Sequence, residues 1–272
     1  AAVLIAPAEP SPRIAAGRPG ASSKGKRWEA AKRLGRSLLD LCVPPACPLC
    51  GADGVPEPPR LTPRCDCRTF VAPACGWCRA CGAPTGPHVP DGDDCAHCRR
   101  EEPFPFSGAV SLGLHEGRLR EAVLHAKADG GRPAARALGE DLLDRWADRL
   151  TGFDLVAAVP HHWTDRLRTA HDPAAELCET LARGLRLPAR PRLVRKRRRT
   201  PKQTDLTPTA RRANLRGAFV LPRPAAVAGK RALLCDDVLT TGATARRVAA
   251  ALRAAGATGV SVAVFARGVG GR

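Results

Sequence analysis

The sequence has no tyrosine and no methionine, and its aromatic residues amount to 4 Trp and 6 Phe in 272 residues. So few aromatic side chains leave little surface on which nucleic acid bases could stack. No stretch approaches the roughly 20 consecutive apolar residues that a membrane span needs. The opening residues AAVLIAPAEP have no basic residue before their short apolar start, which Pro7 interrupts. We therefore expect no signal peptide, no membrane span and a cytoplasmic protein.

Acidic residues are scarce relative to basic ones: 26 Asp and Glu against 44 Lys and Arg give a net charge of +18. This excess favours a polyanionic partner or a phosphorylated substrate. The alternative is that a composition rich in Arg, Ala and Pro reflects the bias of the genome. The apolar share of 44% is ordinary for a globular protein, so a sizeable core can form.

Cysteines are concentrated in one region, because ten of the twelve lie between Cys42 and Cys98. Two thiolates separated by two residues can bind one tetrahedral ion, and pairs of such knuckles a dozen or so residues apart are typical of zinc ribbons. Two of these knuckles have thirteen residues between them and predict one structural zinc site, formed by Cys78, Cys81, Cys95 and Cys98. His97, inside the last knuckle, is expected to be a bystander.

A second structural zinc is predicted from the other knuckle residues, Cys47, Cys50, Cys65 and Cys67. The C-x-C spacing of the last two is less regular, and Cys75 is an alternative candidate for this site. One alternative is a ribbon that has lost this metal. Another is a disulfide framework, which would require secretion. Closed four-thiolate sites leave no position open for a substrate, so we expect structural zinc rather than redox chemistry.

Three segments follow from composition and periodicity. We expect residues 1–26 to be a basic, disordered Pro/Gly/Ala-rich tail, residues 27–100 to form a helix and a double zinc ribbon, and residues 101–272 to form an α/β domain. Apolar patterning predicts helices over 28–42, 135–150, 173–185 and 243–256, and strands over 154–160, 231–238 and 259–267. Strands alternating with helices predict a parallel sheet with helices on both faces.

An acidic pair ends one of the predicted strands. Asp236 and Asp237 complete the apolar run RALLC, although adjacent like charges repel and resist desolvation. The small loop Thr240–Thr244 and a helix follow directly. Helix amino ends and threonine hydroxyls bind phosphate, whereas carboxylates suit sugar hydroxyls or a magnesium ion. Because ligands collect at the carboxyl ends of parallel strands, the sequence predicts a ribose 5-phosphate site here.

This stretch resembles the signature of type I phosphoribosyltransferases, an acidic pair followed by a Thr-Thr-Gly-x-Thr loop between strand and helix. Over residues 42–267 the chain is similar to the late-competence ComF family, which joins a double zinc ribbon to such a domain. The segments CPLCG and CRACGAP resemble its cysteine knuckles. LHAKADGG resembles its basic segment before the first sheet strand, VAAVPHHWTDRLRTAHDPAAEL its pyrophosphate-loop region, and RTPKQTDLTPTARRANLRGAF its flexible loop.

The resemblance implies a site for phosphoribosyl pyrophosphate and magnesium, with the acidic pair as the catalytic residues. The implied ligand-binding residues are Asp236, Asp237, Thr240, Thr241, Gly242, Ala243, Thr244, Val159, Pro160, Arg166, Arg168 and Lys127. The implied flexible-loop residues are Gln203, Arg211, Arg212 and Asn214. The chain departs from the family at one point, since Thr169-Ala170 replace an Arg-Gly found in many members before His171-Asp172.

Two classes of function remain open. The acidic pair and its loop favour an enzyme that transfers a phosphoribosyl group and releases pyrophosphate. The charge, the ribbons and Thr169-Ala170 favour a non-catalytic nucleic-acid-binding module, in which the ribose-phosphate site senses metabolites or binds DNA. For such a module the resemblance implies a role in DNA uptake, with single-stranded DNA and competence helicase-type proteins as partners. The basic run 195–199 could steer pyrophosphate or grip nucleic acid, or be ordinary solvated surface.

Overall fold

The structure is a computed structural model, and it describes residues 46–54, 62, 65–66, 76–86, 88–92, 94–100, 104–160, 171–196 and 219–268. The chain divides between Pro44 and Pro45, and all described residues belong to the unit Pro45–Arg272. The predicted tail over 1–26 and the predicted helix over 28–42 lie outside the described residues. The predicted segment boundaries at residues 26 and 100 stay predictions.

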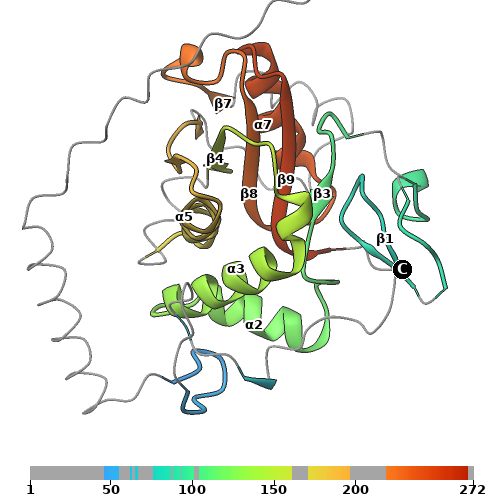
Figure 1. Ribbon diagram of the computed structural model, residues 1–272, viewed down its shortest axis with the longest axis vertical. Coiled ribbons are helices and arrows are strands. Elements are labelled where there is room, and N and C mark those ends of the chain that lie inside the picture. The colour runs from blue at the N-terminus through green and yellow to red at the C-terminus, as the bar shows by residue number, and fades with distance from the viewer. Residues whose placement is uncertain are drawn as a thin grey trace, which may run out of the picture. The chain divides into compact units, whose positions relative to one another are not determined.

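A five-stranded parallel sheet forms the centre of the described part of the chain (Figure 1). Its strand order is β3 (Ala109–Val110), β9 (Gly259–Arg267), β8 (Arg231–Leu239), β4 (Leu155–Ala158) and β5 (Ala189–Arg190). Each neighbouring pair is parallel. The predicted strands over 154–160, 231–238 and 259–267 therefore correspond to β4, β8 and β9, and the α/β fold is confirmed.

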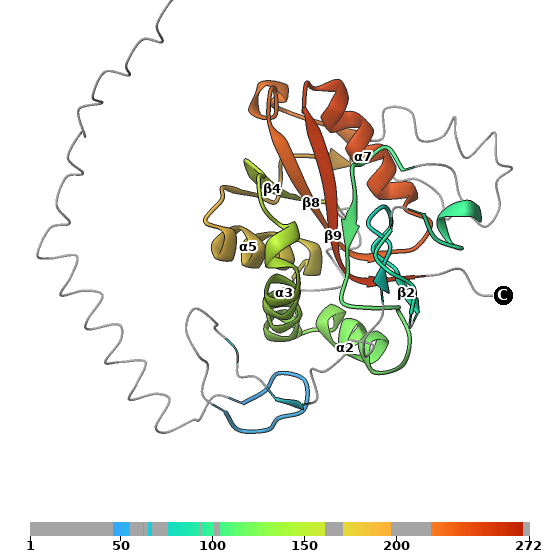
Figure 2. The same ribbon diagram turned by 45° about the vertical axis from the view of Figure 1, so that its right-hand side comes forward.

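Helices cover both faces of this sheet (Figure 2). One face packs against α2 (Gly117–Lys127), α3 (Arg132–Trp146) and α5 (Pro173–Leu185), and the other against α7 (Ala243–Ala254). Because successive residues of a strand point to opposite faces, Leu233 joins the first core and Leu234 the second. Both faces are buried, which explains the apolar runs over 232–235 of β8 and 262–266 of β9.

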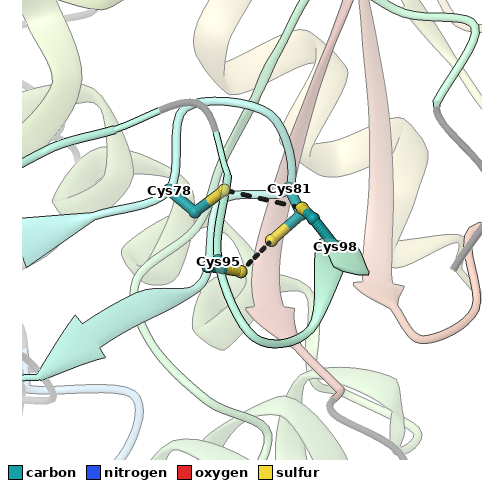
Figure 3. A group of neighbouring side chains, drawn as sticks. All are labelled: Cys78, Cys81, Cys95 and Cys98. Atoms are coloured by element: carbon teal, nitrogen blue, oxygen red, sulfur yellow. Dashed lines mark hydrogen bonds between the residues drawn. The ribbon is translucent and has the colours of Figure 1, made fainter. Parts of the chain in front are cut away.

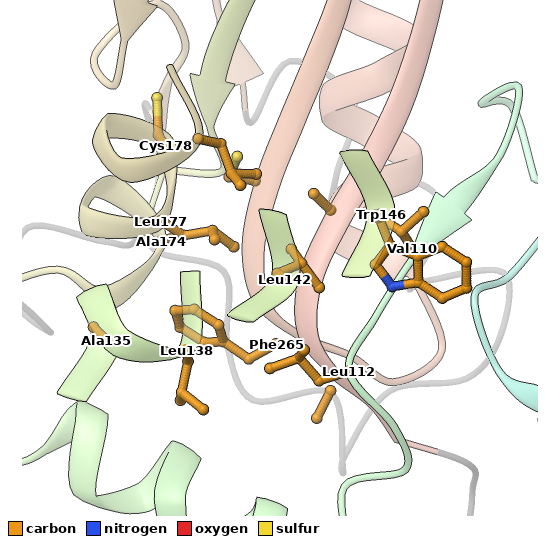
Figure 4. Close-up of a cluster of buried hydrophobic side chains, with 14 of the residues drawn as sticks. Val110, Leu112, Ala135, Leu138, Leu142, Trp146, Ala174, Leu177, Cys178 and Phe265 are labelled. Carbon is orange, nitrogen blue, oxygen red and sulfur yellow. The ribbon is translucent and has the colours of Figure 1, made fainter. Parts of the chain in front are cut away.

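The first core gathers residues from helices and strands that are far apart in the sequence (Figure 4). Leu138, Leu142 and Trp146 lie on the buried side of α3 and pack in the same cluster as Phe265 of β9. The predicted helix over 135–150 thus exists, but α3 begins at Arg132, near Pro133, and is followed by the 3-10 turn η3 (Ala147–Arg149). Proline favours the first turn of a helix because it has no N–H to lose there.

Two features differ from the sequence-based expectation. The segment containing Lys127 forms the end of helix α2, and it does not precede the first sheet strand, because β3 comes before it in the chain. Short strands also form outside the sheet: β1 (Gly76–Trp77) pairs with β2 (Pro84–Gly86), and β6 (Arg195–Lys196) pairs with β7 (Phe219–Val220). Both pairs are antiparallel.

The remaining short elements are 3-10 turns, η2 (Cys98–Arg100) and η5 (Pro224–Ala226). Among the described residues, no helix combines the length and the apolar character that crossing a membrane would require.

Candidate functional site

Four cysteines form a compact cluster on the two knuckles next to β1 and η2 (Figure 3). Their Sγ atoms lie within 4.8 Å of one another, with Cys78 and Cys98 3.6 Å apart and Cys81 and Cys95 3.6 Å apart. Gly82 turns the first knuckle with a φ of 71°, and its N–H donates to the Cys78 carbonyl at 2.8 Å. Four convergent thiols match the ligand set of a structural zinc.

Burial disfavours the charged form of two of these thiols when no cation is bound. Burial raises the pKa of the Cys81 thiol to about 11, and burial raises the pKa of the Cys98 thiol as well. A bound cation reverses this direction, because it stabilises thiolates directly. The convergent geometry of the four thiols fits the zinc site predicted from the spacing of its knuckles.

A second cluster contains the three cysteines Cys47, Cys50 and Cys65, whose Sγ atoms also lie within 4.8 Å of one another. The Cys65 Sγ is 3.3 Å from that of Cys47 and 3.4 Å from that of Cys50. Cys67 and Cys75, the candidates for the fourth ligand, lie outside the described residues. Three thiolates of the predicted second zinc site are thus brought together, and its fourth ligand stays a prediction.

The acidic pair lies near the carboxyl end of the central strand β8. Asp236 is 8% exposed, and its Oδ1 accepts a hydrogen bond from the Asp237 N–H at 2.9 Å. The Asp237 Oδ1 accepts one from the Val238 N–H at 2.6 Å, while its Oδ2 lies 2.8 Å from the Lys127 ammonium. Hydrogen bonds to the charged form and a neighbouring cation both stabilise carboxylates, which explains how the two charges coexist at this position.

The loop after β8 leads directly into α7. Gly242 precedes this helix in the left-handed conformation, with φ 69° and ψ 9°, and a Cβ at this position would lie 2.8 Å from the Phe104 ring. The Thr240 and Thr241 side chains on the loop are exposed. The first N–H groups of a helix have no partner within it, so this loop offers N–H and hydroxyl donors to an anion.

The next strand, β4, ends beside the acidic pair. Ala158 pairs in register with Cys235, and the Val159 N–H donates to the Cys235 carbonyl at 2.8 Å. Val159 and Pro160, predicted to begin the pyrophosphate loop, therefore follow the end of β4 next to Asp236. Arg166, Arg168 and the predicted flexible-loop residues Gln203, Arg211, Arg212 and Asn214 lie outside the described residues.

The described chain resumes at His171, close to the end of α2 that carries Lys127. The His171 Nε2 lies 2.7 Å from the carbonyl of Ala126, the neighbour of Lys127. Asp172 caps α5 by accepting hydrogen bonds from the N–H groups of Ala174 and Ala175. The described residues on the two sides of this gap therefore lie beside β8 and beside the last turn of α2.

Sequence comparisons agree with this geometry. Residues 173–272 match the family model described as "Phosphoribosyl transferase domain". The chain is 31% identical over 177 residues to "DNA utilization protein YhgH" of Escherichia coli (strain K12), covering 62% of this chain and 75% of that protein. It is 28% identical over 183 residues to "Competence protein F" of Haemophilus influenzae, covering 64% of this chain and 78% of that protein. The chain belongs to the ComF/YhgH family.

Membership of the ComF/YhgH family confirms the resemblance that the sequence motifs indicated. Strand β8 and helix α7 lie within the matched residues, so the acidic pair and its loop belong to a phosphoribosyltransferase domain. The two cysteine clusters that precede this domain are consistent with zinc ribbons.

The structure of this ComF/YhgH chain adds His115 to the residues around the acidic pair. Burial, and then the charges of Lys127 and Arg120, lower the pKa of the His115 imidazole, while the charge of Asp237 raises it. Its Nε2 is buried and forms no hydrogen bond with the residues that the structure describes. No motif in the sequence pointed to His115, because it approaches the acidic pair only through the fold.

A cavity of about 390 Å³ lies elsewhere, at the amino-terminal halves of β8 and β9. It is lined by apolar residues such as Leu150 and Phe153, with Arg79 and Arg149 among its polar residues. The acidic pair lies near the opposite ends of these strands. Ligands of parallel α/β sheets bind at the carboxyl ends, so we place the candidate functional site at the acidic pair and not in this cavity.

Proposed function

We propose that the chain binds phosphoribosyl pyrophosphate with magnesium at the carboxyl edge of its sheet, and that it transfers the phosphoribosyl group to an acceptor with release of pyrophosphate. The observation that carries this proposal is the sequence of elements at this edge. Two carboxylates near the end of β8 are followed by a left-handed Gly242 and the amino end of α7, in a domain of the phosphoribosyltransferase family.

Each part of this edge suits one part of the substrate. The 5-phosphate would accept hydrogen bonds from the Thr240–Thr244 loop and the first N–H groups of α7. The ribose hydroxyls would donate to Asp236 and Asp237. The ammonium of Lys127, held 2.8 Å from Asp237, keeps positive charge where the pyrophosphate group would arrive.

The carboxylates also fit magnesium, because this ion prefers oxygen ligands and is bound through one or two carboxylates together with substrate phosphates. Asp236 and Asp237 would hold it, partly through water. When bound, magnesium neutralises charge on the leaving pyrophosphate. The backbone after Val159-Pro160, with Arg166 and Arg168, would bind the same group.

Transfer would break the bond between the anomeric carbon and the pyrophosphate oxygen and form a bond to the acceptor. Positive charge develops on the ribose as the pyrophosphate leaves, and nearby carboxylates stabilise such charge when they are already in place. Pairing with Lys127 and hydrogen bonds to the backbone hold Asp237 in one orientation before the substrate arrives. The predicted closing loop, with Gln203, Arg211, Arg212 and Asn214, would exclude water from this step.

Thermal unfolding with and without phosphoribosyl pyrophosphate and magnesium tests the binding site. A ligand at about 100 times its Kd stabilises the folded state by about 2.7 kcal/mol, so the parent should show a clear rise in Tm. Asp236→Asn combined with Asp237→Asn should abolish this rise without unfolding the protein. Asp154→Asn is the matched control, since Asp154 accepts a hydrogen bond from the Arg231 N–H at the amino end of β8. Unchanged affinity in the double variant would refute the assignment.

Release of pyrophosphate tests the transfer. The parent protein, incubated with phosphoribosyl pyrophosphate, magnesium and a panel of nucleobases, should release pyrophosphate only with its acceptor. Binding without release for every base would leave the site as a sensor rather than a catalytic centre, and would favour the second function.

The second candidate is binding of single-stranded DNA, favoured by the net charge of +18 and by relatives called "DNA utilization protein YhgH" and "Competence protein F". The logarithm of affinity should then fall with that of salt, with a slope of about −0.7 per phosphate neutralised. Replacing Arg197, Arg198 and Arg199 by Ala should flatten this slope by about two units, if each contacts one phosphate. These three residues lie outside the described residues.

The control removes the same charge elsewhere, from the exposed residues Arg183, Arg223 and Lys230. A slope that changes equally in both triple variants would show that only net charge matters. An affinity independent of salt would exclude this candidate.

A further inference from the structure

A charged residue, Arg267, ends the otherwise apolar strand β9 and is 1% exposed. It pairs in register with Leu239, the last residue of β8. It therefore lies where the chain leaves the sheet for the loop Thr240–Thr244, the proposed phosphate-binding loop. Burying a guanidinium group is costly unless its donors are hydrogen-bonded. The position of Arg267 therefore requires nearby acceptors.

The acceptors are the carbonyl groups at the start of that loop. The Arg267 Nη1 donates to the Leu239 carbonyl at 2.7 Å and also contacts the carbonyls of Thr240 and Gly268. Hydrogen bonds that involve a charged group are shorter and about twice as strong as neutral ones. One side chain thus holds the backbone from which the Thr240 hydroxyl and the rest of the loop project.

The backbone of Arg267 also forms hydrogen bonds with the segment that precedes α2. Its N–H donates to the Gly113 carbonyl at 2.8 Å, and its carbonyl accepts from the His115 N–H at 2.8 Å. The segment that contains these two residues leads into α2, whose last residue, Lys127, contacts Asp237. Arg267 therefore connects the phosphate-binding loop with the segment that supplies the cationic partner of the acidic pair.

We infer that Arg267 is a positioning residue: it holds the loop Thr240–Thr244 in the conformation that binds the 5-phosphate of a phosphoribosyl ligand, without touching that ligand. The identity of the ligand rests on the proposed function. The fixed positive charge below the loop adds to the potential that favours an anion. Loss of the side chain should weaken the binding of ligands that carry a 5-phosphate. The binding of ligands without a 5-phosphate should stay unchanged.

Gly268 provides an independent way to move the same loop. A Cβ at Gly268 would lie 2.8 Å from the Thr240 Cγ2 and 3.4 Å from the Thr240 Cα. Gly268→Ala would therefore push Thr240 outward while the buried charge of Arg267 stays in place. This variant separates the position of the loop from the cost of removing a buried arginine.

The test compares Arg267→Met, Arg267→Lys and Gly268→Ala with the parent, all in the whole chain of 272 residues. Titration calorimetry measures the Kd of phosphoribosyl pyrophosphate, ribose 5-phosphate and pyrophosphate, each with magnesium. Hydrogen exchange of the unliganded proteins measures the order of residues 239–244. Arg253→Met is the control, because Arg253 also donates to a carbonyl, that of Pro105 at 2.8 Å, but near the carboxyl end of α7.

We expect Arg267→Met and Gly268→Ala to weaken the binding of both ribose phosphates by about tenfold to a hundredfold, because misplacement of a group by about 1 Å can cost about a hundredfold. Pyrophosphate should bind as in the parent, and exchange should rise in residues 239–244. Arg267→Lys keeps the charge but has fewer hydrogen-bond donors, so its affinity for the ribose phosphates should lie between those of the parent and Arg267→Met. Arg253→Met should match the parent in every measurement.

Parent-like affinity for the ribose phosphates and parent-like exchange of the loop in these variants would overturn the inference, and so would equal weakening of pyrophosphate. If Arg267→Met does not fold, Arg267→Lys and Gly268→Ala decide the question. If the parent binds none of the ligands, the proposed function fails. Hydrogen exchange of the unliganded loop then still decides whether Arg267 holds it.

Discussion

The cysteine knuckles and the parallel sheet are stabilised by different forces. The buried cluster of the knuckles consists of Cys78, Cys81, Cys95 and Ala83. The sheet instead buries Leu, Val, Ala and aromatic side chains in two large clusters, one on each face. A module with so few apolar side chains cannot offset the entropy of folding by burial alone, so we expect it to depend on metal coordination. The sheet domain has no such need.

The two regions nevertheless share one junction. Trp77 of β1 packs edge-on against Trp146 of α3, with ring centroids 5.0 Å apart. The Ser111 hydroxyl donates to the Gly82 carbonyl at 2.6 Å, and Arg149 forms an ion pair with Asp91. Buried aromatic pairs and hydrogen bonds of this kind couple folding units. A substitution that destabilises one region should therefore destabilise the other only slightly.

Loss of a zinc ligand should have the largest effect. Cys81→Ser removes one thiolate of the four-cysteine cluster, and structural zinc contributes about 10–16 kcal/mol in zinc-finger peptides. We expect the zinc content to fall by one ion per chain and residues 76–100 to become sensitive to protease, while the far-UV signal of the sheet domain persists.

Cys178→Ala is the control, since Cys178 is a buried thiol of α5 that donates to the Val156 carbonyl. It should leave the zinc content unchanged. Full zinc content in Cys81→Ser would show that this cluster is not the metal site.

A core substitution in the sheet domain should have the opposite effect: it should destabilise the sheet domain and leave the zinc content unchanged. Leu142 is fully buried in α3, and Leu→Ala at such positions costs about 2–5 kcal/mol. Leu142→Ala should therefore lower the free energy of unfolding in urea by this amount while both zinc ions remain bound. Leu124→Ala, at a position that is 45% exposed on α2, is the control and should have little effect. A loss of zinc from Leu142→Ala would mean that the two regions fold as one unit.

Removal of a hydrogen bond at the junction should have a smaller effect. Ser111→Ala leaves the Gly82 carbonyl without its donor, and an unsatisfied buried group costs about 1–3 kcal/mol. Hydrogen exchange should rise in residues 76–86 more than in β8 or β9. Thr151→Ala removes a hydroxyl that donates to the local Asp148 carbonyl at 3.2 Å and should change neither region. Equal exchange in Ser111→Ala and the parent would show that this bond does not couple the regions.

The smallest effect concerns His115 and pH. Burial lowers the pKa of His115 below its ordinary value of 6.5. The unfolded state therefore binds the proton more readily, so the stability that His115 contributes is present above about pH 6.5 and is lost as pH falls towards its folded-state pKa. The urea midpoint of His115→Gln should fall less than that of the parent between about pH 7 and pH 5.

His125→Gln, at an exposed position of α2, should follow the parent across this range. Identical pH dependence in parent and His115→Gln would contradict the assignment of this loss to His115.

Local patterns in the sequence were sufficient to predict most helices and strands of the sheet domain. The bounds predicted for α5 and β9 agree with the structure, because their apolar residues repeat with clear helical and strand periods. Helix α2 was not predicted, although Leu119, Ala122, Val123 and Ala126 have helical spacing and are buried. Two of the four are alanines, which contrast weakly with the polar residues around them.

The sequence by itself determined the chemistry of the sites: the knuckle spacing of the four clustered cysteines, and the acidic pair followed by a threonine-rich loop. Only the tertiary structure decided which distant residues join them. Lys127 reaches Asp237, and Arg267 reaches Thr240, because parallel strands and their crossover helices bring separate segments to one edge of the sheet. Such contacts depend on strand register and helix docking, which no local pattern of residues encodes.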